Sequence, residues 1–67
     1  MFNRKTTEAV ITQTRLNDKG IPGSFKVPGV VSFDTKDGCL QGLDRRGKVI
    51  VLVDLKDVAA AVIEVTK

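Results

Sequence analysis

The chain has 67 residues, which is enough for one small domain, because a chain of this length buries only about 60% of the surface that its unfolded form exposes. With 42% apolar and 28% charged residues it is too apolar for a disordered chain, and no apolar run approaches the roughly 20 residues of a transmembrane helix. It contains no histidine, and its single cysteine, Cys39, excludes an internal disulfide. The composition predicts a soluble globular domain that is not an enzyme and holds no metal or cofactor.

The first seven residues contain Arg4 and Lys5 but no apolar stretch of the kind that a secretory signal requires. We therefore expect a flexible basic arm over residues 1–7, followed by a single small β domain over residues 8–67. A lone cysteine suits a reducing compartment. We accordingly expect a cytoplasmic protein that does not associate with membranes.

The first half of the chain reads as strands separated by a long loop. Residues 8–16 are rich in β-branched side chains and alternate in polarity, which predicts the first strand. Residues 17–23 concentrate asparagine, glycine and proline and are expected to form the loop. Any strand over residues 24–27 should either lie at a sheet edge or break at Pro28, because proline has no amide hydrogen to donate. A strand is expected to resume over residues 29–33.

Two consecutive hairpins are predicted in the middle of the chain. Asp34 and Asp44 are typical of the opening of a turn, and Gly38 and Gly47 suit the left-handed positions that close one. The sequence therefore predicts tight turns at D-T-K-D-G and at D-R-R-G.

The run V-I-V-L-V at residues 49–53 is apolar on both of its faces. Strands of this kind are usually covered on each side, so we expect it to be the central strand of the sheet. Gly42, in the preceding strand, is interpreted as the site of a bulge or bend.

The C-terminal residues admit two interpretations. As a helix from about residue 55, the segment would begin with Asp54 as its N-cap, and it would carry one apolar stripe made of Leu55, Val58, Ala59 and Val62. As a strand, residues 54–57 would form a tight turn and residues 59–65 would return along the sheet. Four of the five residues in V-I-E-V-T are β-branched, which favours the strand.

With the strand, the fold class is all-β, an antiparallel barrel of five to six short strands. The order of turns and the stretch 48–65 resemble a small SH3-like or Sm-like barrel, a resemblance of architecture that implies no particular activity. With the helix, the fold becomes α+β, an antiparallel sheet with a C-terminal helix.

Two functional classes fit this architecture. The one we favour is a protein-interaction or assembly module that dimerises or binds another protein, because residues 49–53 and 58–65 supply more apolar surface than a thin barrel can bury. The expected interface residues are Val58, Val62, Ile63 and Val65.

The alternative is a basic β-barrel that binds DNA or RNA through phosphate contacts, without strong sequence specificity. Arginine forks match phosphate oxygens, and the formal net charge is +3. The candidate contacts are Arg4, Lys5, Arg45, Arg46 and Lys48. With aromatic residues at 4% of the chain, stacking on bases is not expected.

Overall fold

The computed structural model describes residues 6–66, which form six strands and one short 3-10 turn. The elements in chain order are β1 (Thr6–Leu16), β2 (Pro22–Pro28), β3 (Ser32–Lys36), β4 (Cys39–Leu43), β5 (Val49–Asp54), η1 (Leu55–Asp57) and β6 (Val58–Thr66). They make two antiparallel three-stranded sheets with the orders β2-β1-β6 and β3-β4-β5. The all-β antiparallel class predicted from the sequence is confirmed for the described residues.

The C-terminal segment is a strand, so the helical alternative from residue 55 is wrong. The Asp54 side chain accepts a hydrogen bond from the Lys56 amide at 3.4 Å and caps the single turn of η1. β6 then pairs with β1 from Val58 to Thr66, which satisfies backbone groups that a helix would pair internally. The dense β-branched residues of this segment suit the extended conformation.

The first sheet is built around β1, which pairs with both of its neighbours. Thr6 lies opposite Thr66 and Thr7 opposite Val65, so the strand begins two residues before the predicted boundary at residue 8. Residues 1–5 of the expected arm lie outside the described residues. Ala9 and Ile11 are buried and alternate with less buried neighbours, so the face of β1 that carries these two residues packs against the core.

Both predicted hairpins are confirmed, with one difference in the first turn. Asp34 lies within β3 rather than at the opening of the turn. The two central residues of the turn are Asp37 and Gly38, both with positive φ (53° and 76°), a combination that joins twisted antiparallel strands without splaying them. Gly47 closes the second turn with φ of 81°, as expected.

The prediction that residues 49–53 form the central strand is wrong. β4 is the centre of the second sheet, and β5 lies at its edge. The chain leaves β5 through η1 and crosses to the other sheet, so β5 acquires no second neighbour. Consequently Val49, Ile50 and Leu52 are exposed, while Leu40 of β4 is buried.

A strand was also expected to resume at residue 29, but residues 29–31 instead link the two sheets. β2 does end at Pro28 and does lie at an edge, as predicted. The Gly29 amide donates to the Thr7 carbonyl at 2.8 Å, and the Val31 amide donates to the Leu43 carbonyl at 2.8 Å. The link is thus hydrogen-bonded to one strand of each sheet, and the side chain of Val30 between them is fully buried.

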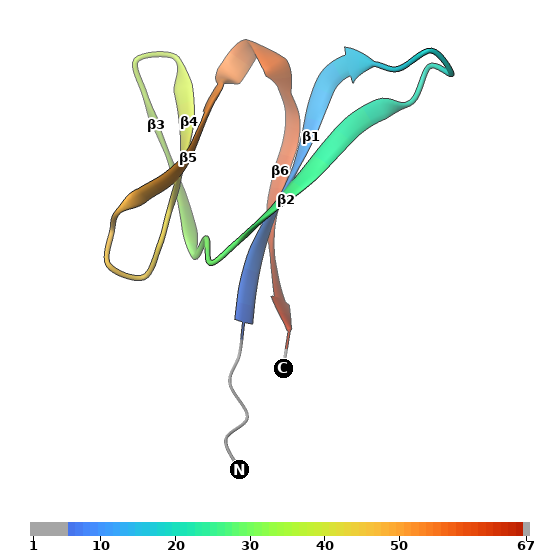
Figure 1. Cartoon of the computed structure of the whole chain (residues 1–67). Coiled ribbons are helices and arrows are strands. Elements are labelled where there is room, and N and C mark those ends of the chain that lie inside the picture. Colours follow the sequence, from blue (N-terminus) through green and yellow to red (C-terminus); the bar gives the residue numbers. More distant parts are fainter. Residues whose placement is uncertain (1–5, 67) are drawn as a thin grey trace.

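The two sheets do not close into a barrel, because no strand pairing joins them among residues 6–66. In Figure 1 they form two diverging arms, connected by the 29–31 link at one end and by η1 at the other. The molecule measures 45 × 30 × 12 Å, and its smallest extent is close to the width of three strands spaced about 4.8 Å apart. Its core is correspondingly small, consisting of Ala9, Ile11, Val30 and Leu40.

Gly42 lies where the second sheet meets this core. The register between β4 and β5 shifts between Gly42 and Leu43, so the predicted irregularity at this glycine is confirmed. A Cβ atom at Gly42 would overlap the Val51 side chain and lie 3.1 Å from Val30 Cγ2. The residue is therefore required for space.

We predict that Gly42→Ala lowers the free energy of unfolding by about 1–3 kcal/mol, the usual effect of an added methyl group in a packed core. Denaturant unfolding of Gly42→Ala, Val51→Ala and the double variant provides the test. Because Val51→Ala removes the overlapping atoms, the double variant should lose less stability than the two single losses together. Strict additivity would show that the Gly42–Val51 contact is not the cause.

Candidate functional site

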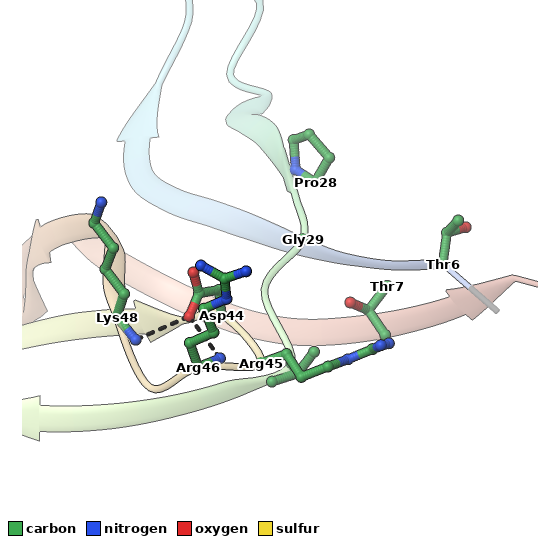
Figure 2. Close-up of a pocket in the computed structure, with 9 residues that line it drawn as sticks. Thr6, Thr7, Pro28, Gly29, Asp44, Arg45, Arg46 and Lys48 are labelled. Atoms are coloured by element: carbon green, nitrogen blue, oxygen red, sulfur yellow. Dashed lines mark hydrogen bonds between the residues drawn. The ribbon is translucent and has the colours of Figure 1, made fainter. Parts of the chain in front are cut away.

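The basic hairpin tip between β4 and β5 is shaped by Asp44. Its Oδ1 atom accepts hydrogen bonds from the amides of Arg46 and Lys48, each at 2.9 Å (Figure 2). The Asp44 carbonyl accepts a hydrogen bond from the Gly47 amide at 3.0 Å. A carboxylate oxygen that binds two backbone amides fixes the loop locally. Asp44 therefore holds in place the segment that carries Arg45.

The same five-residue turn occurs between β1 and β2. The Asn17 side chain accepts from the amides of Lys19 and Ile21 at 2.8 and 3.0 Å, and the Asn17 carbonyl accepts from Gly20 at 2.9 Å. Gly20 has φ of 77°, close to the value at Gly47. The side-chain oxygen is thus the common requirement of this turn, supplied once by an amide and once by a carboxylate.

A groove of about 550 Å³ runs between the D-R-R-G tip and the start of β1. We call it the basic groove; it is lined by Thr6, Thr7, Pro28, Gly29, Val31, Asp44, Arg45, Arg46 and Lys48. Arg45, Arg46 and Lys48 are exposed, and within residues 6–66 none of the three forms an ion pair. Guanidinium, ammonium and hydroxyl donors in one concavity suit an anionic ligand.

Of the five candidate nucleic-acid contacts, the structure places three in the basic groove. Arg4 and Lys5 lie outside the described residues and directly precede Thr6 in the sequence. Sequence reasoning missed Thr6, Thr7 and the link residues of the groove. Two threonines at the start of a strand carry no signal of their own, and only the 29–31 link brings them opposite the hairpin tip.

All four predicted interface residues lie on β6. Val62 and Val65 are exposed, at 53% and 57%, whereas Val58 and Ile63 are half-buried. Ile63 lies opposite Ala9 on the core-facing side of the sheet, and Val62 lies opposite Val10 on the other side. β6 therefore presents an exposed apolar residue on a face that no other described strand covers.

The four edge strands differ in how they are protected against pairing with another chain. β2 begins and ends with proline and carries Lys26, β3 carries two charged residues, and the β5 ladder is interrupted by its register shift. Prolines, charges and bulges of this kind prevent edge-to-edge pairing. β6 pairs with β1 in unbroken register from Ala60 to Thr66 and has Glu64 as its only charged residue, so it is the least protected edge.

A second, smaller cavity of about 210 Å³ opens beside η1 and is lined by residues of both sheets, including Ile11, Phe25 and Val53.

Across the described part of the chain, no group of three or more acidic or cysteine residues is arranged to hold a metal ion. Cys39 is a half-buried free thiol. No helix within residues 6–66 has the length and apolarity needed to cross a bilayer.

The turn geometry yields a prediction for Asp44. We expect Asp44→Ala to cost about 1 kcal/mol of stability, because two amides lose their acceptor. Asp44→Asn should be nearly neutral, since Asn17 performs the same role in the equivalent turn. Urea denaturation of both variants measures the difference, and equal destabilisation by Asn and Ala would show that the charge, rather than the hydrogen-bond geometry, holds the turn.

Comparison with protein-family models, curated proteins and solved structures finds no match for the chain. The β6 edge and the basic groove are therefore the features from which a function can be inferred.

Proposed function

We propose that the chain is a non-catalytic assembly module that associates with a second copy of itself. The observation that carries this proposal is that more large apolar residues are exposed than are buried in the core. Among residues 6–66, four apolar residues are buried, whereas nine large apolar residues are exposed. The exposed residues are Leu16, Ile21, Val31, Val49, Ile50, Leu52, Leu55, Val62 and Val65.

The chemistry of the chain supports a role without catalysis. With no histidine, the chain lacks the usual proton-transfer group at neutral pH. The order of turns resembles that of an SH3-like or Sm-like barrel, but the two sheets lack the strand pair that would close one. A strand contributed by a second copy is one way to extend such a sheet.

Light scattering across a concentration series tests the assembly proposal. We predict that the average mass rises from 7.3 kDa toward twice that value between about 10 μM and 1 mM, the range of a modest interface without disulfides. The reason is that association buries the apolar surface that the monomer leaves open. A constant monomer mass over the whole range would overturn the proposal and leave only a different protein as partner.

The basic groove favours a second candidate function, the binding of a nucleic-acid backbone. Two arginines and a lysine line one concavity together with two threonines, and basic side chains of this kind contact phosphates without reading sequence. Binding of this kind weakens steeply with salt, because each neutralised phosphate releases counterions.

A matched pair of charge reversals tests this candidate. Arg45→Glu with Arg46→Glu changes the formal net charge from +3 to −1, and Lys19→Glu with Lys36→Glu does the same at the other two hairpins. We predict that the first pair abolishes binding to a generic RNA or DNA at low salt, whereas the second weakens it only modestly. Equal losses would indicate general charge attraction instead of the groove, and no binding by the wild type would remove the candidate.

A further inference from the structure

The outer edge of β6 has a residue pattern that is complementary to itself. The segment from Ala60 to Glu64 reads A-A-V-I-E, with two small residues before Val62 and two large ones after it. If two such strands pair antiparallel about a two-fold axis through Val62, Ala61 lies opposite Ile63 and Ala60 opposite Glu64. Each large side chain then faces a small one, so the two strands approach without steric conflict.

The charges disfavour a parallel arrangement. Glu64 already lies opposite Glu8 of β1, and Glu8 is bridged by Lys26 at 3.6 Å. In the antiparallel pairing, Glu64 of each copy lies opposite an alanine. A parallel pairing in register would instead place the two Glu64 carboxylates side by side, and like charges in that position are destabilising.

The apolar surface also becomes continuous in this arrangement. Lys26, Val10 and Val62 lie side by side across β2, β1 and β6 on the face away from the core. Pairing at Val62 continues this row through Val62 and Val10 of the second copy. The exposed Val62 side chains then pack against each other at the axis, in the middle of a six-stranded sheet.

From these observations we infer that two copies join through β6, antiparallel and centred on Val62, into one six-stranded sheet with the order β2-β1-β6-β6-β1-β2. This inference rests on the proposed assembly function and specifies its interface. The occupant is a second copy because the size pattern and the charge pattern are both matched to β6 itself.

Disulfide cross-linking tests the register directly, in a Cys39→Ser background that removes the native thiol. Residues directly opposite in antiparallel strands have Cα atoms about 4.5–5.5 Å apart, within disulfide range. Val62→Cys should therefore cross-link to its own copy on mild oxidation. Val10→Cys, the matched control on the same face, would lie about 14 Å from its equivalent, three strand spacings away, and should stay monomeric on denaturing gels.

A second pair of variants tests the interface without oxidation. Val62→Lys places two ammonium groups at the axis and should reduce the association constant at least tenfold. Leu16→Lys is the control, because Leu16 is about as exposed as Val62 (57% and 53%) and lies far from β6 in the register of β1. Light scattering should find Leu16→Lys associating like the wild type, with circular dichroism confirming that both variants are folded.

Each outcome has one meaning. Cross-linking at Val62 but not at Val10, with dissociation by Val62→Lys alone, supports the β6 interface. A wild type that associates while Val62→Cys fails to cross-link, or while folded Val62→Lys still associates, overturns this interface and leaves the assembly function standing. A wild type that remains monomeric overturns both. If Val62→Lys does not fold, the cross-linking pair decides.

Discussion

The width of the two sheets is the constraint on which the rest of this structure depends. Each sheet has three strands, so only β1 and β4 have neighbours on both sides, and the buried strand residues belong to these two strands. The edge strands β5 and β6 leave apolar side chains exposed, because each pairs with a neighbour on one side only. A chain of 67 residues has no further segment in its described part with which to cover them.

The connections between the strands explain how so small a core still has a fixed arrangement. The 29–31 link carries Val30 into the centre and is hydrogen-bonded to Thr7 and Leu43, one in each sheet. Gly42 leaves the space that Val30 occupies. The chain thus packs its few buried apolar side chains together at one point between the sheets. Five of the nine exposed large apolar residues lie on β5 and β6, where a second chain can bury them.

Much of the fold could be predicted from the sequence, because its determinants are local. The two hairpins follow from Gly38, Asp44 and Gly47, whose turn chemistry acts within five residues. The C-terminal strand follows from β-branched density. The position of β5 could not be predicted, because an apolar run does not reveal whether the next strand returns beside it or crosses to another sheet. The basic groove was predicted only in part for the same reason, since the 29–31 link, and not a local pattern, brings Thr6 and Thr7 opposite Arg45.

The central claim is that a protomer with exposed apolar edge strands is stabilised by a second copy. Dimerisation coupled to folding makes the melting temperature depend on protein concentration, because mass action favours the associated folded state. Thermal unfolding followed by circular dichroism at about 10 μM and about 1 mM therefore tests the claim most directly. We predict a midpoint that rises by several degrees over this range. An identical midpoint at both concentrations would contradict the account, because it would show that the monomer's small core alone determines its stability.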